Sequence, residues 1–238
     1  MPMMRSVTRS TPCLIKLLSK GSSKVAAISD LARINDAADH PLDLFRKWHG
    51  EARKFIAPAP DALCLATVCK DLKVSARNVV LREFDQEGFV IVTDTRSRKS
   101  AEIENVPEAA MCFLWFYVNE LKHEITKQVR VEGTVKRLEK ERFQHLYDRE
   151  PIFCKIRSHL CHQGQPVDWV SLKRKHDQIL DSVRRNENYL PMPEHFVGYK
   201  FFPKIMEFYF ARDNLIGDRL IYRKDEETDS WDHQRIAA

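Results

Sequence analysis

Five stretches of apolar or alternating sequence follow one another between residues 62 and 136, and they restrict the fold more than any other feature. They span residues 62–68, 74–84, 88–93, 109–117 and 123–136. Short polar connections at Asp71 and around Gly88 separate the first three, as in antiparallel hairpins. Three further strand candidates, at 197–202, 205–211 and 219–223, close the chain. Many antiparallel strands with few helices predict a barrel, because closure removes exposed sheet edges.

Helical patterns flank this series. Residues 40–56 place apolar side chains at helical spacing, and prolines follow directly; these side chains are Leu44, Phe45, Trp48, Ala52 and Phe55. Further helices are expected near 98–105, 139–148 and 167–186, with less regular chain between the last two. The fold class is therefore mainly β with flanking helices.

The first 29 residues contain five basic residues and no acidic one, which accounts for the whole net charge of +5. The rest of the chain is electrically balanced, so a nucleic-acid-binding surface is not supported. No apolar run approaches the ~20 residues of a membrane helix. With 43% hydrophobic and 31% charged residues, the chain has the composition of a globular protein. Neither nucleic acid nor membrane is expected as a partner.

Residues 1–38 are interpreted as a leader and residues 39–238 as one domain. Its first 29 residues, which are free of acids and contain Ser and Thr, are typical of a mitochondrial transit peptide, and a disordered tail explains them equally well. The six cysteines are scattered without a CxxC pair, as expected for reduced thiols in an intracellular protein. The expected location is the cytoplasm or the mitochondrion.

The segment from Thr93 to Ile103 predicts an anion site. An apolar run ends at Thr93, and Ser97 suits the N-cap of the helix that follows. Arg98 and Lys99 then fall in the first turn, where cations oppose the helix dipole. A bound phosphate would explain this arrangement, because free N–H groups and two cations form a phosphate pocket.

A second segment, 127–133, reads as a strand with one polar face. Gln128, Arg130 and Glu132 share that face, whereas Val129 and Val131 share the other. A polar face of this kind indicates a lined binding surface.

Together these segments resemble the FMN-dependent pyridoxamine/pyridoxine 5′-phosphate oxidases, which make pyridoxal 5′-phosphate. The resemblance runs from about Pro41 to the end of the chain. Its motifs are ALCLATV (62–68), VSARNVVLREF (74–84), GFVIVTD (88–94), SRK (97–99), KQVRVEG (127–133), MEFY (206–209), DRL (218–220) and the closing Trp231 and Arg235. The resemblance implies an FMN-binding split antiparallel β-barrel whose homodimer holds two FMN molecules at the subunit interface.

The resemblance also implies which residues bind FMN. Arg98 and Lys99 would bind the phosphate, and Gln128 would come from the partner subunit. Tyr209 stands where the family usually has Trp, and Gly164 where it usually has Ser. The full implied set is Arg77, Asn78, Val79, Val80, Val92, Thr93, Arg98, Lys99, Gln128, Gln163, Gly164, Tyr209 and Arg219. Taken singly, each polar residue is better explained as a solvated surface group, whereas together and in the order of the family they favour flavin binding.

The substrate site departs from the family pattern. The family holds the substrate phosphate with Lys, Tyr, Arg and Ser; the matching positions here are Arg82, Leu146, Glu150 and Cys154. The family's Arg-x-His pair is replaced by Leu215 and Gly217. Glu150 is the most damaging change, because a carboxylate repels a phosphate dianion. Arg149, Lys155 or Arg157 would compensate only if the local register were shifted.

Two functions follow from this reading. One is an FMN oxidase of pyridoxamine or pyridoxine 5′-phosphate, in which Arg82 and Arg219 are the remaining catalytic aids. The alternative is a flavin-binding paralogue with a diverged pocket, which acts on another substrate or without catalysis. A metal site at Cys154, His159, Cys161 and His162 is disfavoured, because the spacing lacks the paired pattern of structural zinc.

Overall fold

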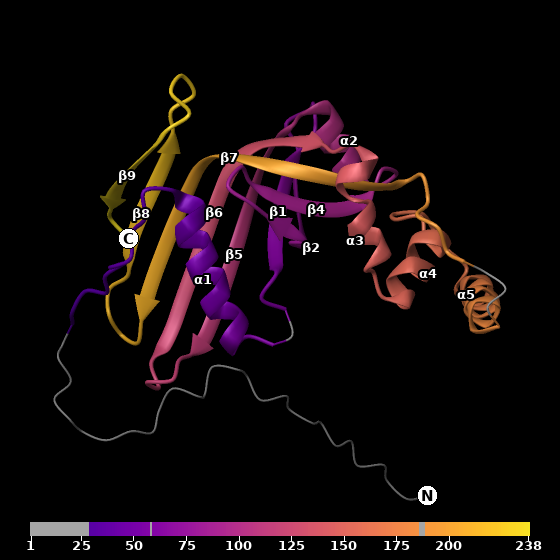
Figure 1. The fold of residues 1–238 in the computed structure, drawn as a ribbon, viewed down its shortest axis with the longest axis horizontal. Coiled ribbons are helices and arrows are strands. Elements are labelled where there is room, and N and C mark those ends of the chain that lie inside the picture. Colours follow the sequence, from indigo (N-terminus) through magenta and orange to yellow (C-terminus); the bar gives the residue numbers. More distant parts are fainter. Residues whose placement is uncertain (1–28, 58, 186–188) are drawn as a thin grey trace, which may run out of the picture.

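The computed structural model describes residues 29–57, 59–185 and 189–238, so most of the expected leader, residues 1–28, lies outside the described residues. The chain forms a curled antiparallel sheet with the strand order β2-β1-β5-β6-β7-β4-β3, extended beyond β7 by β8 and β9 (Figure 1). The strands are β1 (Ala62–Val68), β2 (Val74–Val80), β3 (Glu83–Phe84), β4 (Phe89–Asp94), β5 (Glu108–Val118), β6 (Glu124–Arg137), β7 (Phe196–Arg212), β8 (Asp218–Lys224) and β9 (Trp231–Ile236).

The helices lie around this sheet. They are α1 (Pro41–Phe55), α2 (Arg98–Asn105), the short 3-10 helix η1 (Lys140–Arg142), α3 (Gln144–Asp148), α4 (Ile152–Leu160) and α5 (Trp169–Arg184). Helix α1 packs across the sheet, whereas α5 lies at the far end of the molecule and has no buried residue (Figure 1). No helix among the described residues is long and apolar enough to cross a membrane.

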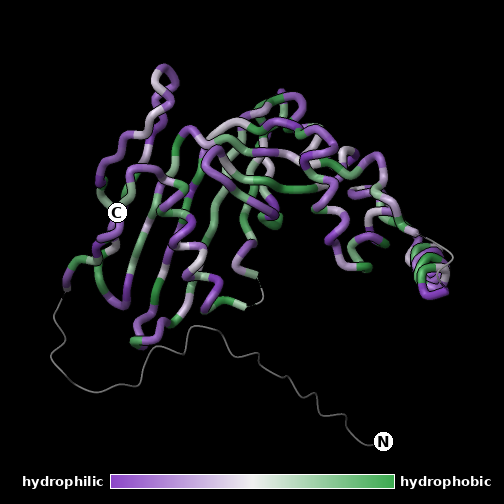
Figure 2. The backbone as a smooth tube through the Cα atoms, viewed as in Figure 1, coloured by the Kyte–Doolittle hydropathy of each residue, from purple (hydrophilic) through white to green (hydrophobic). Residues whose placement is uncertain are grey.

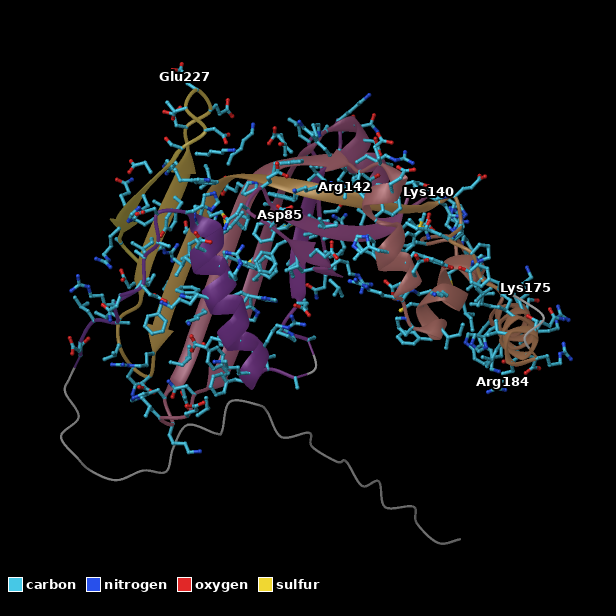
Figure 3. All side chains as sticks on the ribbon, viewed as in Figure 1. Asp85, Lys140, Arg142, Lys175, Arg184 and Glu227 are labelled. Carbon is cyan, nitrogen blue, oxygen red and sulfur yellow. The ribbon has the colours of Figure 1, made fainter. Side chains whose placement is uncertain are left out.

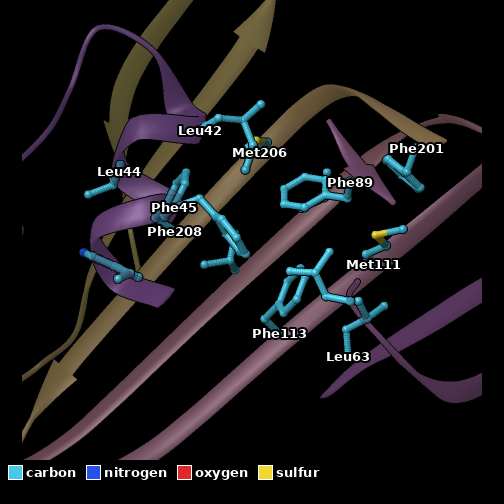
Figure 4. Packing of buried hydrophobic residues seen from close by; sticks show 14 of the residues in the cluster. Leu42, Leu44, Phe45, Leu63, Phe89, Met111, Phe113, Phe201, Met206 and Phe208 are labelled. Carbon is cyan, nitrogen blue, oxygen red and sulfur yellow. The ribbon is translucent and has the colours of Figure 1, made fainter. Parts of the chain in front are cut away.

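The core lies between α1 and the inner face of the sheet. Phe45 of α1 has edge-on or tilted ring contacts at 4.9–5.9 Å with Phe89, Phe113 and Trp115 (Figure 4). Burial of each such ring stabilises the fold by roughly 1.5–3 kcal/mol. Of the five residues expected to share the apolar face of this helix, Leu44, Phe45, Trp48 and Ala52 are buried, and Phe55 is half-buried against the core.

Burial alternates along β5 and β6 and separates an inner from an outer face. Figure 2 colours the chain by the hydropathy of its residues. In β5, the aromatic residues Phe113, Trp115 and Tyr117 are buried. The residues between them point outward, and Leu114, Phe116 and Val118 are 49%, 64% and 53% exposed. The outer face of β5 is therefore apolar and exposed in the single chain.

The mainly antiparallel architecture confirms the expected fold class, and four details differ from the sequence reading. The expected strand 74–84 is interrupted after Val80, and the expected strands 197–202 and 205–211 form one strand, β7. The pairing of β6 with β7 shifts register at a bulge between Glu132 and Gly133, where Gly133 lies opposite Pro203. Helix α4 occupies chain that was expected to be irregular, and β9 was not expected.

The segment 30–38, assigned above to the leader, packs against the domain. Ile34 is 3% exposed and belongs to the main core. Its backbone N–H donates to Asp218 Oδ2 at 2.7 Å, and Leu31 pairs with Ile216. The expected boundary at residue 39 therefore falls within chain that contacts β8.

Candidate functional site

Lys99 lies at the centre of the first group of site residues. Its side chain is buried at the start of α2, directly after the Ser97 N-cap. Its Nζ donates to Thr93 Oγ1 at 2.9 Å and to Gln163 Oε1 at 2.7 Å. Burial and the nearby charge of Arg77 lower the pKa of Lys99 to about 8. The structure thus brings four of the expected cofactor residues together, namely the buried cation Lys99 and its neighbours Thr93, Gln163 and Arg77.

Glu102 is the carboxylate that organises the neighbouring cations. It is 5% exposed and accepts hydrogen bonds from Thr67, Ser75, Arg77 and Arg98 at 2.5–3.1 Å. Burial alone would raise its pKa, but these hydrogen bonds, led by those of Thr67, Arg98 and Arg77, lower the pKa of Glu102 to about 2. Glu102 therefore carries a permanent charge that fixes Arg77.

The role of Glu102 changes the interpretation of Arg98. Arg98 Nε bonds Glu102 at 2.7 Å, one helical turn away, and its side chain is 67% exposed. This ion pair offsets the unfavourable position of Arg98 at the helix start. Among the described residues no carboxylate forms an ion pair with Lys99, so Lys99 is the residue whose placement points to an anion.

A second group of site residues forms a row across the outer face of the sheet. Strand register places Gln128 of β6 beside Tyr209 of β7, and Tyr209 beside Arg219 of β8. The guanidinium of Arg219 lies 5.2 Å from the centre of the Tyr209 ring and donates to Glu207 at 2.8 Å. Its Nε is buried and bonds to no described residue.

The two groups lie on opposite faces of the sheet. Arg77 is opposite Leu65, which is opposite Met111, which is opposite Val131, and the last three are buried. Because directly paired residues share a face, Arg77 belongs to the inner face. Gln128 alternates with the buried Val129 and therefore belongs to the outer face. One chain alone does not bring the two groups together.

The other expected cofactor residues lie on β2, on β4 and in the loop after α4. Asn78 and Val80 are exposed on β2, whereas Val79 packs against the main core. Val92 packs against the small cluster formed by residues 90, 143 and 146. Gly164 has φ +85° in an exposed loop, and a Cβ at this position would meet no atom within 4 Å, so this glycine leaves open space.

The expected substrate residues Arg82 and Glu150 form an ion pair. Arg82 Nη2 donates to Glu150 Oε1 at 2.5 Å, and the Glu150 side chain is 4% exposed. The other oxygen, Oε2, is buried and has no hydrogen bond of good geometry among the described residues. The Cys154 thiol is the donor beside this carboxylate; burial, and then its hydrogen bond to Glu150, raise the pKa of the thiol. Leu146 instead packs into the small cluster with Val90 and Phe143.

The remaining pair, Leu215 and Gly217, lies in the β7–β8 connection. A Cβ at Gly217 would lie 2.4 Å from Cε2 of Tyr209, so the tyrosine ring occupies the space of the missing side chain. Leu215 is half-buried, and its N–H donates to the carbonyl of Arg212 at 3.0 Å.

A cavity of about 390 Å³ adjoins Arg82 and lies between α1 and the β3–β4 hairpin. Its lining includes Arg82, Val90 and two residues labelled in Figure 3, Asp85 and Arg142. Its acids are largely paired with cations; for example, Asp85 binds Lys200 at 2.7 Å. The cavity therefore offers room beside Arg82 without a strong net charge.

Sequence reasoning missed Glu102, Thr67, Ser75 and Glu207. The i,i+4 spacing of Arg98 and Glu102 was the one available signal, since such pairs meet on a helix. In the group that was disfavoured as a metal site, His159 Nε2 contacts the carbonyl of Pro191 at 2.8 Å. Among the described residues no group of three or more His, Cys, Asp or Glu side chains could hold a metal ion.

Comparison with known proteins identifies the family and the fold of this chain. The family model described as pyridoxamine 5′-phosphate oxidase matches residues 49–155, and the pyridoxine 5′-phosphate oxidase C-terminal dimerisation region matches residues 196–238. The pyridoxine/pyridoxamine 5′-phosphate oxidase of Salinibacter ruber is 33% identical over 214 residues, which cover 89% of this chain and 94% of the relative. The Thermosynechococcus vestitus protein of the same name is 33% identical over 203 residues, 85% and 90% of the two chains.

Two solved structures have the same fold. PhzG from Burkholderia lata, in complex with tetrahydrophenazine-1-carboxylic acid, has a TM-score of 0.75 at 24% identity over 88% of this chain and all of that chain. A pyridoxamine 5′-phosphate oxidase-related, FMN binding protein from Nostoc punctiforme has a TM-score of 0.62 at 17% identity, covering 82% and 96%. The chain belongs to the pyridoxamine 5′-phosphate oxidase family, whose matched relatives are named as oxidases.

Proposed function

We propose that this protein is an FMN-dependent oxidase that converts the aminomethyl or hydroxymethyl group of a pyridoxamine- or pyridoxine-type substrate to the aldehyde, using oxygen. The relatives are named for pyridoxine and pyridoxamine 5′-phosphate, whose oxidation product is pyridoxal 5′-phosphate. The observation that carries the proposal is Lys99, a buried cation held by two neutral side chains, Thr93 and Gln163.

The chemistry of this donor set fits the FMN phosphate. A buried ammonium without a carboxylate partner is unfavourable unless an anion binds it. Arg77, which lowers the pKa of Lys99, adds a second positive charge at the same place. The N-terminal N–H groups of α2, capped by Ser97, point to the same region. Lys99, Arg77 and the start of α2 would hold the phosphate.

The outer row supports the position of the flavin ring. The buried Nε of Arg219 is a donor without a described partner, and buried donors are almost always hydrogen-bonded in complete sites. Gln128 and Tyr209, which lie beside it, offer an amide and an aromatic ring. The acceptor atoms of a flavin ring would accept hydrogen bonds from Arg219 and Gln128, and the ring itself would pack beside Tyr209.

A homodimer would complete the site. The phosphate-binding group and the ring-binding row lie on opposite faces of one sheet, and a second copy can present the row that one chain lacks. The exposed apolar side chains of β5, Leu114, Phe116 and Val118, lie on the same outer face. The match of the C-terminal dimerisation region to residues 196–238 supports the same arrangement.

The residues of the chain bind and orient the reactants. These residues would hold FMN, which would supply the redox chemistry, namely the two-electron oxidation of the substrate carbon with oxygen as the final electron acceptor. Arg219, fixed by Glu207 at 2.8 Å, keeps a positive charge beside the ring-binding row. Arg82 binds Glu150 and lines the cavity of about 390 Å³.

The second candidate is a flavin-binding paralogue without oxidase activity, and the Arg82–Glu150 pair favours it. The pair neutralises a cation that would otherwise be available to a substrate phosphate. In this case the chain keeps the cofactor site and acts as a binding protein.

The visible spectrum of the purified full-length protein tests both candidates. We expect a yellow protein whose flavin band bleaches when pyridoxine, pyridoxine 5′-phosphate or pyridoxamine 5′-phosphate is added without oxygen. A colourless protein that does not bind added FMN would refute the flavin site. A yellow protein that none of the three compounds bleaches would favour the paralogue.

A further inference from the structure

Cys64 and Cys112 lie directly opposite each other on neighbouring antiparallel strands. The register of β1 and β5 pairs these two residues. Each cysteine is half-buried and lies between two buried residues of its own strand. Both side chains therefore project from the outer face of the sheet, where they are partly exposed in the single chain. The proposed cofactor and substrate sites use neither thiol.

Backbone hydrogen bonds show which kind of antiparallel pair the two cysteines form. The Cys69 N–H donates to the carbonyl of Lys73 at 3.1 Å, which continues the pairing of β1 with β2. Backbone groups alternate in direction along a strand, so Cys64, an odd number of residues earlier, directs its N–H and C=O toward β5. Cys64 and Cys112 are thus a hydrogen-bonded pair, in which the Cα atoms are about 5.5 Å apart.

This spacing permits a disulfide between the two strands. A disulfide joins Cα atoms that are about 4.4–6.8 Å apart. The Cβ atoms of a directly opposed pair are up to about 5.5 Å apart, and a disulfide draws them to about 3.5–4.5 Å. Closure therefore needs a shift of roughly 1 Å, and the resulting bond is easily reduced.

The two thiols differ in how readily they lose a proton. Burial, and then the neighbouring Cys64, raise the pKa of the Cys112 thiol. Cys112 therefore stays protonated at neutral pH, and Cys64 is the sulfur that reacts first with an oxidant. The Cys112 thiol donates a weak hydrogen bond to the carbonyl of Phe113 at 3.8 Å, which costs little to break.

We propose that Cys64 and Cys112 form a reversible disulfide when the protein meets hydrogen peroxide. The Cys64 sulfur attacks one peroxide oxygen; an S–O bond forms, the O–O bond breaks, and the leaving hydroxide takes up the Cys64 proton as water. The Cys112 sulfur then attacks the Cys64 sulfur; the S–S bond forms, the S–O bond breaks, and a second water carries away the Cys112 proton. The two thiols lose two electrons and two protons, and the peroxide gains both.

The pair lies beside the ring-binding row. Leu114, two residues beyond Cys112 on the same face, pairs with Gln128 of that row. Two residues span about 7 Å along a strand. Oxygen that accepts two electrons at the row becomes hydrogen peroxide, so under the proposed function the oxidant forms close to the thiols. The disulfide step itself needs only the peroxide and does not depend on that function.

A disulfide at this place fastens the β1–β2 hairpin to the rest of the sheet. Strand β2 ends the strand order, and the ladder that joins β1 to β5 extends only from Cys64 to Thr67 on β1. The hairpin also carries Arg77 of the expected cofactor site. The cross-link restricts the unfolded chain, so we expect the oxidised protein to unfold at a temperature about 5 °C or more higher than the reduced protein.

Peptide mapping by mass spectrometry, applied to the purified full-length protein before and after treatment with hydrogen peroxide, tests the proposal. Peroxide is the chosen oxidant because a second copy of the chain on this face would shield the pair from larger reagents. We expect a linked pair of peptides that contain Cys64 and Cys112, and the return of both thiols after dithiothreitol is added. The absence of this link, a disulfide from either cysteine to another chain, or sulfinic acids in place of the link would overturn the proposal.

Cys64→Ser and Cys112→Ser assign the change in stability, and Cys69→Ser is the matched control. Cys69 is also half-buried and directly follows β1, but it lies opposite Lys73. We expect peroxide to raise the unfolding temperature of the unmodified protein and of Cys69→Ser, and to leave that of the other two variants unchanged. An equal rise in all four proteins would refute the role of the pair. Mapping of the unmodified protein needs no variant, so it decides the question even where a substitution prevents folding.

Discussion

The ring of Tyr209 lies over the backbone of Gly217, where a Cβ would be 2.4 Å from Cε2 and 2.6 Å from the hydroxyl oxygen. The tyrosine and the glycine are therefore coupled: each occupies space that a larger residue at the other position would need. Arg219, whose guanidinium lies 5.2 Å from the same ring, depends on this packing for its place in the ring-binding row.

Gly217→Ala should displace the Tyr209 ring from Arg219. We expect the free energy of unfolding to fall by about 1–3 kcal/mol, as for other overpacked sites, and FMN affinity to fall by about tenfold or more. Urea denaturation and flavin fluorescence titration measure the two effects. Gly50→Ala is the control, because Gly50 lies in α1, where an added Cβ would meet no atom within 4 Å. FMN affinity equal to that of the unmodified protein in Gly217→Ala would contradict the coupling.

Glu102→Gln should destabilise the protein by about 3–5 kcal/mol near neutral pH, because it leaves Arg77 without its buried counter-charge. The folded-state pKa of Glu102 is lowered to about 2 from an ordinary 4.5, so its stabilisation is present above pH 4.5. That stabilisation is lost as the pH falls from 4.5 to 2.

Urea denaturation at several pH values measures the free energy of unfolding of Glu102→Gln and of the unmodified protein. The difference between the two free energies should become smaller as the pH falls from 4.5 to 2. Glu104→Gln on the same helix, where the side chain is 48% exposed, is the control and should change stability little. A difference that stays constant from pH 6 to pH 3 would show that Glu102 does not carry the pH dependence.

Elements with a clear burial pattern could be predicted from sequence, and the others could not. The alternation of polar and apolar residues in β6 and the apolar face of α1 are dictated by local chemistry, and the structure follows them. Helix α4 has nine residues and buries only Ile156 while it exposes Ile152 and Phe153, so packing against the core contributes little to its formation. Strand β9 is mostly exposed and forms because β8 offers it an edge.

The site was predictable where it rests on local motifs. Ser97 caps α2, and Lys99 meets Thr93 six residues earlier in the chain. The pairing of Arg82 with Glu150 joins residues 68 positions apart, and no local pattern encodes it. The division of the cofactor residues between two sheet faces likewise depends on strand order, which sequence periodicity does not determine.

FMN affinity should decrease as the pH rises above about 8. In the ligand-free protein burial lowers the pKa of Lys99 to about 8 from an ordinary 10.5, so the cation loses its proton in this range. A phosphate dianion favours the protonated form, and FMN binding should therefore take up protons between pH 8 and 10. Calorimetry in buffers of different ionisation enthalpy measures this uptake.

Lys99→Arg provides the comparison for this effect, because the guanidinium keeps its charge throughout the range. In that variant we expect no proton uptake. The same linkage predicts that the ligand-free unmodified protein gains stability from pH 8 to 10.5, since the unfolded chain binds the additional proton there. Equal proton uptake in both proteins would assign the titration to another group.

Phe116→Asp should convert the protein to a monomer that no longer retains FMN. Phe116 is 64% exposed on the outer face of β5, beside the row of Gln128 and Tyr209, and a buried aspartate at a subunit contact would lack a partner. Because the side chain is exposed in the single chain, the fold and its circular dichroism should persist. Light scattering gives the mass, and the visible spectrum gives the bound flavin.

Leu72→Asp, at a residue 82% exposed in the β1–β2 turn, is the control and should remain dimeric and yellow. A monomeric Phe116→Asp variant that retains full FMN would show that one chain suffices for the cofactor, and the division of the site between two sheet faces would then need another explanation.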